Sequence, residues 1–378
     1  MNTGIVVRRL RPADYAALGP AFNELARRAV AVNPHMAPAA VCAATELLDE
    51  ADIVILAAWL SEALGHERLV GVWALRRRRD WRSGFSAVLV APLLPLYEVS
   101  SVPVIDRDHA EDVATSLLRY LTASRDLPKT LALPLRPVDG PGFPALAEAC
   151  RATGSSLRFY ERWLRPVMLP APGDDAERYL RRSLGQAYKK RMQQFRAVAR
   201  HGLVTFQRLR GAAARAELNA FLALELSGWK GKAGTAIASR PRDDAYVHRL
   251  AERAAEADML QIDTLLLDGK PIAIGLLLDC AGTRHFLKIA YDERAARHSP
   301  GRNLAIAMLR ADFAGTPAVV FDSGAGEEVD PGTYPWGERR AMANALLRIG
   351  SDDRGLPEAA AFARMWLRRL RSRLRRSD

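Results

Sequence analysis

The sequence predicts an α/β protein of the layered α+β kind, in which mixed sheets are flanked by helices. The first observation is that short apolar runs typical of strands alternate with longer segments of helical periodicity, instead of forming blocks of either kind. The second is composition: the chain of 378 residues is 49% hydrophobic and 26% charged, the balance of ordinary globular proteins. A largely disordered, collagen-like or disulfide-stapled chain is therefore excluded.

The first half of the chain shows this alternation clearly. Residues 108–125 carry four apolar side chains on one helical stripe, namely Val113, Leu117, Leu118 and Leu121. The other elements expected here are strands at 5–9, 52–58, 68–75 and 130–135 and helices at 14–31 and 144–152.

A segment rich in proline and glycine, residues 165–175, has no periodicity and predicts a junction. Beyond it, Asp268-Gly269 lies between two apolar runs, which is a strong hairpin signal. The expected elements are helices at 176–201 (broken near Gly185), 212–227, 242–257 and 304–314 and strands at 260–267, 272–280, 284–291 and 318–321. We expect one unit at 1–168, a second at 169–350, and a basic amphipathic helix within 351–378.

The two halves resemble each other locally. Residues 68–75 and 270–277 are both predicted strands that contain small residues and are entered through a turn, 202 residues apart. Duplication of one α/β unit explains this similarity, and so does chance likeness between two buried strands. Both explanations stay open at this point.

The chain is strongly basic, with 55 Lys and Arg against 43 Asp and Glu and a net charge of +12. This charge favours polyanionic partners such as nucleic acid, an anionic membrane or a phosphate-rich cofactor, although a GC-rich genome also enriches arginine. The cysteines, Cys42, Cys150 and Cys280, are far apart and odd in number, which favours a reducing compartment.

No segment predicts export, membrane insertion or metal binding. The N-terminus lacks a long apolar region, and the apolar stretches at 53–60 and 87–97 are too short or too rich in proline to span a bilayer. The histidines are scattered, without His-x-x-His, Cys-x-x-Cys or Glu-x-x-His spacing. We therefore expect a cytoplasmic protein without a metal.

The loop before the helix at 304–314 has the features of a phosphate site. Ser299 suits the N-cap, Pro300 the first turn, and Gly301 permits close approach of a ligand to the backbone. A helix start offers backbone N–H groups and a positive dipole end to an anion, and Arg297 and Arg302 flank it. An ordinary capped helix start is the alternative.

Several motifs in this half occur together in a known family. They are Phe286–Tyr291 with Asp292, Glu293 and Arg297–Gly301; Gly228-Trp229-Lys230-Gly231 with Gly234-Thr235; Lys270-Pro271-Ile272-Ala273; Phe321-Asp322-Ser323-Gly324 followed by Trp336; and, earlier, Leu69–Arg77. In order and spacing the chain resembles the FemAB-related, CelD-like acyltransferases of the GNAT superfamily, over residues 68 to 340.

The resemblance implies two tandem GNAT-like units, the second of which binds an acyl-CoA such as acetyl-CoA. The loop residues that would hold the cofactor are Arg297, Ser299, Gly301, Arg302 and Asn303. This loop has one glycine and a proline where the usual GNAT loop has Gln/Arg-x-x-Gly-x-Gly/Ala. The departure is in keeping with the FemAB-like branch, which includes enzymes that use aminoacyl-tRNA, so the donor is one of these two.

Acyl transfer to an amine needs a deprotonated nucleophile, a donor to the developing oxyanion and a proton for the leaving thiolate. Asp322 is the candidate base or ammonium anchor, Tyr291 the candidate acid, and Lys288 a candidate partner for an anionic group. The structural alternatives are a turn-forming aspartate, a core or rim tyrosine and a solvent-facing lysine.

Four further residues are candidates for contact with the acceptor substrate. Trp229, Lys230 and Lys232 follow an apolar helix, and Glu225 lies one helical turn before Trp229. They predict a positively charged rim of the substrate or cofactor site beside the indole ring. The alternative is a solvated loop tip preceded by a surface glutamate.

Two basic segments remain. Residues 178–200 interleave arginines and lysines with Tyr179, Tyr188 and Phe195, which fits either a phosphate backbone or a solvated helix face. Residues 358–376 carry an apolar stripe and seven arginines. Such a helix either docks on the body of the protein or contacts an anionic membrane surface.

The resemblance implies an acyl-CoA-dependent N-acyltransferase, and we expect it to act on a small amine, an amino sugar or a cell-envelope precursor. The first alternative is an aminoacyl-tRNA-dependent aminoacyltransferase that binds tRNA. The second is a non-catalytic adaptor for nucleic acid or a membrane surface.

Overall fold

The computed structural model describes residues 4–91, 93–94, 97–140, 142–315, 319–326, 329–351 and 355–374. The chain forms two compact units: Met1–Trp163 together with Ala341–Asp378, and Leu164–Arg340. We call them unit 1 and unit 2. Residues 341–378 belong to unit 1, because the strand at Glu338–Arg348 pairs with the strand at Thr130–Pro137.

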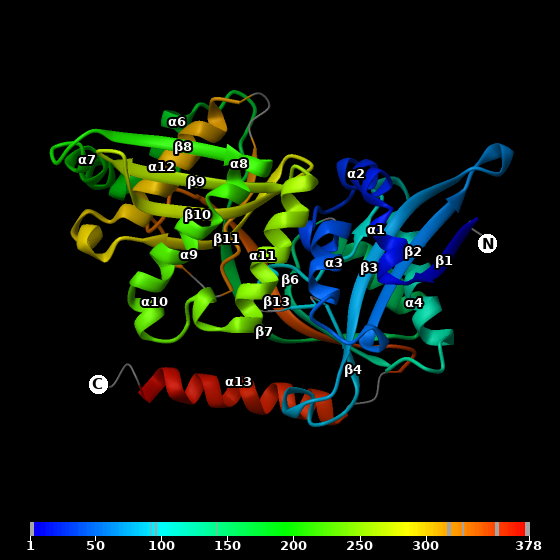
Figure 1. Cartoon of the computed structure of the whole chain (residues 1–378). Coiled ribbons are helices and arrows are strands. Elements are labelled where there is room, and N and C mark those ends of the chain that lie inside the picture. Colours follow the sequence, from blue (N-terminus) through cyan, green and yellow to red (C-terminus); the bar gives the residue numbers. More distant parts are fainter. Residues whose placement is uncertain are drawn as a thin grey trace. The chain divides into compact units, whose positions relative to one another are not determined.

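In unit 1, whose elements are labelled in Figure 1, the strands in spatial order are β1 (Ile5–Leu10), β2 (Ile53–Ser61), β3 (Glu67–Arg78), β4 (Val88–Val90), β6 (Thr130–Pro137) and β13 (Glu338–Arg348), and β5 (Val104–Ile105) pairs with β3. Among the described residues of this unit, β4 pairs with β6 in parallel and the other pairs are antiparallel. The helices of unit 1 are α1 (Pro12–Ala16), α2 (Gly19–Arg27), α3 (Pro38–Thr45), α4 (Ala110–Ala123), α5 (Gly142–Ala152) and α13 (Leu356–Leu374). The predicted stripe of α4 is buried, as its spacing requires.

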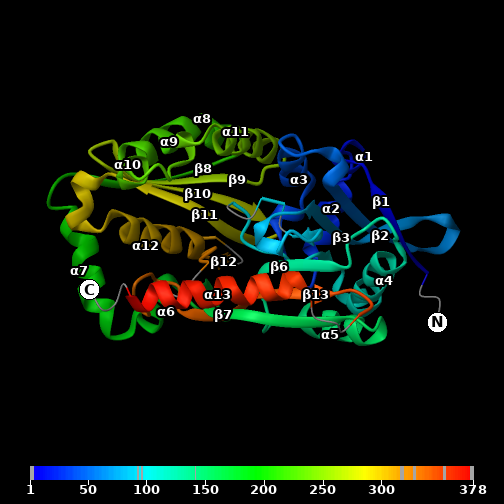
Figure 2. The same cartoon turned by 90° about the horizontal axis from the view of Figure 1, so that it is seen from below.

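In unit 2, the strands in spatial order are β7 (Ser156–Met168, of which residues 164–168 belong to this unit), β12 (Val320–Asp322), β11 (Thr283–Tyr291), β10 (Lys270–Cys280), β9 (Leu260–Leu267) and β8 (Val204–Arg210). Among its described residues this part of the sheet is antiparallel except where β11 meets β12. The helices of unit 2 are α6 (Ala176–Leu184), α7 (Tyr188–Val198), α8 (Gly211–Ala216), α9 (Leu218–Ser227), α10 (Trp229–Lys232), α11 (Pro241–Glu256) and α12 (Pro300–Phe313). Figure 2 shows this sheet between α8, α9 and α11 on one face and α12 on the other.

Local signals account for much of unit 2. The predicted meander is β9–β10–β11, and both of its turns have the positive φ angles that such hairpins need: +50° and +75° at Asp268 and Gly269, then +47° and +79° at Ala281 and Gly282. The predicted helix at 176–201 breaks at Gly185, which has a φ of +49°. Strand β8 has no counterpart among the expected elements.

Some expectations fall outside the described residues. The expected strand at 318–321 begins on an undescribed residue, and β12 covers Val320–Asp322. The amphipathic helix forms as α13, but its side chains from residue 368 onward are not described. In the described part of the chain, no helix is long and apolar enough to cross a membrane, and no three His, Cys, Asp or Glu side chains are grouped as a metal would need.

Candidate active site

Strands β11 and β12 run in parallel for only three residues. Thr283–His285 pair with Val320–Asp322, and the following six residues of β11 continue past the end of β12. The register of β11 against β10 also shifts, because Leu276 pairs with Lys288 and Leu277 with Phe286. Such a bulge changes which face the side chains occupy and is common beside functional sites. The predicted residues Lys288 and Tyr291 lie on this extension.

The loop after β11 is held by its own hydrogen bonds. Ser299 has a φ of +52°, and its carbonyl oxygen accepts from the backbone N–H groups of Arg302 (3.0 Å) and Asn303 (3.1 Å). Its side chain makes no capping hydrogen bond. The Asn303 amide is buried and donates to the His298 carbonyl at 2.9 Å. Ser299 and Asn303 therefore shape the loop, and α12 begins at Pro300, a residue suited to the first turn.

Gly301 lies against β11. A Cβ built at this position would be 3.1 Å from the Cδ1 atom of Ile289, closer than ordinary van der Waals contact. The glycine thus lets the start of α12 approach the strand, and a large side chain here would force the two apart. Arg297 is exposed, and its Nε donates to Nε2 of His298 at 3.0 Å.

The start of α12 also brings together two arginines. Two effects lower the pKa of Arg191, on α7: burial is the larger, and the positive charge of Arg302, on α12, is the second. The two guanidinium groups are therefore close enough to repel each other. Arg191 donates to the Gly332 carbonyl (3.1 Å) and to Oε1 of Gln194 (3.0 Å). Within the described residues, neither arginine forms a salt bridge with a carboxylate. Two like charges beside a helix N-terminus form a site suited to an anion.

Tyr334 joins this group. Burial raises the pKa of Tyr334, the charge of Arg302 opposes this rise, and Tyr291 adds to it, so the three side chains interact electrostatically. The ring of Tyr334 also stacks on Trp336 with centroids 5.1 Å apart. Neither Arg191 nor Tyr334 was predicted as a site residue, because their proximity to α12 depends on the tertiary fold.

A second cluster gathers three predicted residues around one buried carboxylate. Oε1 of Glu225 accepts from Nζ of Lys230 at 3.1 Å and lies 3.2 Å from Nζ of Lys288, while Oε2 accepts from the Ile237 backbone N–H at 2.8 Å. Lys230 also donates to the Ile289 carbonyl at 2.6 Å. Burial lowers the pKa of Lys230 more than the attraction of Glu225 raises it. Two ammonium groups on one carboxylate leave the cluster one positive charge in excess.

Trp229 and Tyr291 border this cluster. A small hollow beside it is lined by Leu224, Glu225, Gly228, Trp229, Lys230, Ile289, Ala290 and Tyr291. Trp229 is 52% exposed, which suits a rim position. Lys232 faces outward and pairs with Glu293 at 2.9 Å.

Asp322 lies in a different environment from the one expected of a base. It is buried, and its carboxylate contacts Nη1 of Arg165 (3.3 Å), Nη1 of Arg340 (3.0 Å) and the Gly324 backbone N–H (2.9 Å). Burial would raise the pKa of Asp322, but the attraction of nearby cations, Arg165 foremost, outweighs it and lowers that pKa. The carboxylate therefore stays ionised and is already occupied by two guanidinium groups. Next to it, burial lowers the pKa of His285 to about 4, which keeps the imidazole neutral.

Known proteins resemble this chain in sequence and in structure. Residues 186–334 match a family model described as an acetyltransferase (GNAT) domain. Over 91% of this chain and 97% of the other, the structure is similar to the crystal structure of FemX, with 10% identity and a TM-score of 0.60. A second similar structure is the C-terminal domain (DUF2156) of a putative lysylphosphatidylglycerol synthetase from Agrobacterium fabrum (12% identity, TM-score 0.52, covering 94% and 95%). No curated protein matches the chain.

These comparisons define the class of protein. Residues 186–334, which lie within unit 2, form a GNAT-type acetyltransferase domain. The structures of FemX and of the DUF2156 domain are only 10% and 12% identical to this chain, so they show a shared fold. The chain therefore carries a GNAT domain within unit 2, and the predicted mixed α/β fold with flanking helices is confirmed.

Proposed function

We propose that this protein transfers an acyl group from an acyl-CoA, such as acetyl-CoA, to an amine, with the reaction in unit 2. The observation that carries the proposal is the arginine pair Arg191–Arg302 at the start of α12, which lies without a carboxylate partner in the described residues. A pyrophosphate carries the charge that such a pair lacks, and the helix N-terminus adds N–H donors.

The residues around the pair support an acyl-CoA better than an isolated phosphate. The close approach of Gly301 to Ile289 places the start of α12 directly beside β11, along which the rest of the ligand would extend. Arg297 and Arg302 lie on either side of Gly301, while Ser299 and Asn303 shape the loop backbone. These five loop residues, together with Arg191, are the proposed cofactor site.

The bound thioester supplies a carbonyl carbon that an amine attacks, so that a C–N bond forms, the C–S bond breaks and the thiolate takes up a proton. We assign that proton to the hydroxyl of Tyr291, which lies at the end of β11 and interacts with Tyr334. The attacking nitrogen loses one proton as the amide forms, and this proton returns to the oxygen of Tyr291, so the protons balance over one turnover. Asp322 is assigned a positioning role, because both of its arginine partners already occupy it. It holds β12 to β7, which carries Arg165.

The acceptor is assigned to the Glu225–Lys230–Lys288 cluster with Trp229 as its rim. The excess positive charge favours an acceptor that bears a carboxylate or phosphate as well as an amine, as small amino acids, amino sugars and envelope precursors do. The exposed Trp366 on α13, 62% exposed in this basic helix, is consistent with an acceptor presented at an anionic membrane surface.

Calorimetric titration with acetyl-CoA tests the donor. We expect saturable binding by the wild-type protein and a loss of affinity of about tenfold or more in both Arg302→Ala and Arg191→Ala, because each removes a charge-assisted contact. Lys190→Ala, an exposed neighbour on α7, is the matched control and should bind as the wild type does. The absence of saturable binding by short and long acyl-CoAs would overturn the proposal.

Aminoacyl-tRNA is the second candidate donor, favoured by the likeness to FemX and to a protein named for the synthesis of lysylphosphatidylglycerol. The basic segment gives it limited support. Tyr179 is fully buried, Tyr188 lies under Arg181 and Phe195 under Arg310, so none of these rings is an open stacking surface. Lys189, Lys190, Arg196 and Arg200 are exposed and are the residues left for a phosphate backbone.

The two donors respond differently to the same variants. If aminoacyl-tRNA is the donor, the double variant Lys189→Ala/Lys190→Ala should weaken tRNA binding and reduce the salt dependence of that binding. Acetyl-CoA should then bind neither the wild type nor the variant. If acyl-CoA is the donor, this double variant should keep full acetyl-CoA affinity.

A further inference from the structure

Unit 1 buries an arginine without a counter-charge. Arg136, on β6, is 2% exposed, and its Nε and Nη1 have no hydrogen-bond partner among the described residues. No described carboxylate forms a salt bridge with it. A buried guanidinium without a partner is among the most unfavourable groups a folded protein can hold, so its retention calls for a physical reason.

The backbone before Arg136 is held in a conformation that leucine avoids. Leu135 has a φ of +54°, in the left-handed region. The register of β6 against β13 shifts here, because Arg136 pairs with Ala343 but Leu133 pairs with Ala345. Between these pairs, Oδ1 of Asn344 accepts from the Leu135 backbone N–H at 3.0 Å, and the Asn344 amide donates to Glu161 at 2.7 Å. A bulge of this kind sets the direction of the next side chain.

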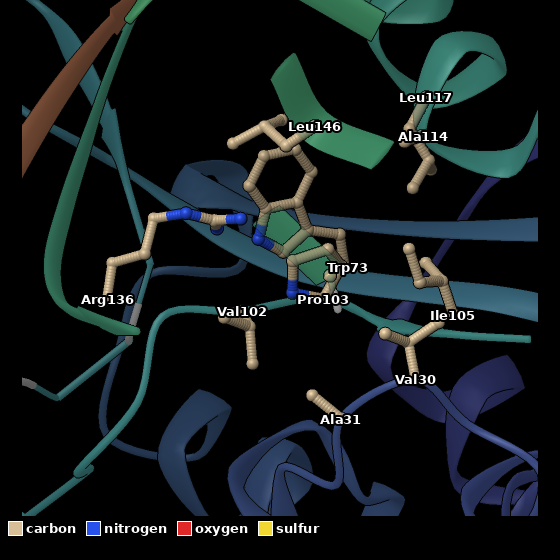
Figure 3. A pocket seen from close by; sticks show the side chains of 11 residues that line it. Val30, Ala31, Trp73, Val102, Pro103, Ile105, Ala114, Leu117, Arg136 and Leu146 are labelled. Atoms are coloured by element: carbon tan, nitrogen blue, oxygen red, sulfur yellow. The ribbon is translucent and has the colours of Figure 1, made fainter. Parts of the chain in front are cut away.

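The guanidinium reaches an apolar cavity of about 30 Å³ (Figure 3). Figure 3 shows Arg136 pointing toward Trp73, with Leu146 beside the ring and Val102 and Pro103 below it. The indole N–H of Trp73 is already directed to the Ser101 carbonyl, at 3.4 Å. The remaining lining residues are Val30, Ala31, Ile105, Ala114, Leu117 and Gly142. Arg136 is thus the charged group of an otherwise apolar cavity.

The Cys150 thiol, which acts electrostatically on Arg136, does not neutralise the positive charge of the guanidinium. Burial lowers the pKa of Arg136 to about 10, and the Cys150 thiol opposes this only slightly. Burial raises the pKa of that thiol to about 11, so Cys150 is neutral at pH 7. Arg136 is charged at that pH, and the positive charge in the cavity needs an anion from elsewhere.

We propose that this cavity of unit 1 binds a small organic carboxylate of the size of formate to acetate, with at most a methyl group as its apolar tail. The carboxylate accepts charge-assisted hydrogen bonds from Arg136, and the tail packs against the aliphatic lining. The size follows from the volume: about 10–15 Å³ of such space holds one water, so the cavity has room for an anion of only a few heavy atoms. The aliphatic lining favours an organic acid over a hydrated inorganic ion.

Calorimetric titration of the full-length protein, in a chloride-free HEPES buffer, distinguishes the possible ligands. The probes are sodium acetate, the neutral isostere acetamide, and sodium chloride. We expect saturable acetate binding and affinities at least tenfold weaker for the other two. Arg136→Met should abolish acetate binding, whereas Arg119→Met, an exposed arginine of α4, should bind as the wild type does.

Thermal unfolding provides the second readout. Acetate should raise the midpoint of the wild type in a concentration-dependent manner and leave that of Arg136→Met unchanged. Without ligand, Arg136→Met should unfold at the same or a higher temperature than the wild type, because methionine removes a buried charge while keeping most of its volume. No acetate response in the wild type would overturn the proposal, and a lower midpoint in Arg136→Met would then make Arg136 a structural residue. Equal binding of chloride and acetate would overturn the assignment to an organic acid.

Discussion

The two units treat buried charge in opposite ways. In unit 2 the buried acids are surrounded by cations: Arg208 contacts both Asp263 (2.6 Å) and Asp312 (2.7 Å), and Asp322 contacts Arg165 and Arg340. Unit 1 also has paired acids, such as Asp106 with Arg28 and Arg68 and Glu358 with Arg348, but it buries Arg136 without a carboxylate partner among the described residues. Compensated charge fixes the geometry of a fold, whereas uncompensated charge marks a place for a ligand or a proton.

The largest expected effect comes from breaking a compensated group. Asp322→Ala should lower the free energy of unfolding of the protein by about 3–5 kcal/mol, because it removes a buried carboxylate that both Arg165 and Arg340 contact. Urea denaturation measures this change. The control is Glu252→Ala, which removes an exposed partner of Arg215 and should change stability by less than about 0.5 kcal/mol. Equal effects of the two variants would refute the distinction between buried and exposed pairs here.

The second effect concerns a proton in unit 1. Burial raises the pKa of Glu98 to about 8, although two backbone N–H groups, of Leu93 and Leu94, donate to its carboxylate. Because the folded pKa exceeds the unfolded one, the folded state binds the proton more tightly. The contribution of Glu98 to the free energy of unfolding is fully present below the unfolded pKa, near pH 4.5. It is lost as the pH rises toward 8, by at most about 1.4 kcal/mol per pH unit.

Glu98→Gln checks this sign, because glutamine has the shape of the protonated acid but does not titrate. Between pH 5 and pH 8 the wild type should lose stability to urea faster than the variant. Parallel curves for the two proteins would show that the carboxyl does not hold its proton in the folded state.

A smaller effect is expected at the proposed cofactor site. Arg191→Met should increase the stability of the protein without ligand by about 0.5 kcal/mol, because it removes repulsion from Arg302, while it weakens acetyl-CoA binding. Arg196→Met, on the same helix, should change neither quantity. A destabilised Arg191→Met would mean that the hydrogen bonds to Gly332 and Gln194 outweigh the repulsion.

The smallest effect concerns a strained turn in unit 2. Ala281 is exposed and has a φ of +47°, so Ala281→Gly should raise stability by up to about 1 kcal/mol, measured as a higher midpoint in urea. This turn provides a reference for the left-handed leucine at position 135, where strain sits beside a buried charge. A loss of stability in Ala281→Gly would show that this φ costs the chain nothing.

The sequence predicts the elements whose signals are local. The turns at Asp268-Gly269 and Ala281-Gly282, the break at Gly185 and the stripe of α4 all follow from neighbouring residues. β13 was not predicted, because its sequence, ERRAMANALLR, is rich in good helix formers and becomes a strand through pairing with β6. β8 was not predicted either, because none of its residues is fully buried and its sequence lacks a strong apolar alternation.

The candidate site shows the same limit. Motifs indicated the start of α12 and the lysines near Glu225, and the structure brings Glu225, Lys230 and Lys288 together. The proximity of Arg191 to Arg302 was not predictable, because it links helices more than a hundred residues apart in the sequence. The pairing of Asp322 with Arg165 and Arg340 depends in the same way on three separate strands.

The return of residues 341–378 to unit 1 has a consequence for synthesis on the ribosome. When the first 163 residues have emerged, β6 still lacks the partner that β13 later supplies, and about 180 more residues must be translated first. At about 5–20 residues per second, that delay lasts on the order of 10–35 seconds. Unit 2 is contiguous and emerges whole in the meantime, so during this delay the nascent chain exposes an unpaired strand edge, the kind of surface on which chains aggregate.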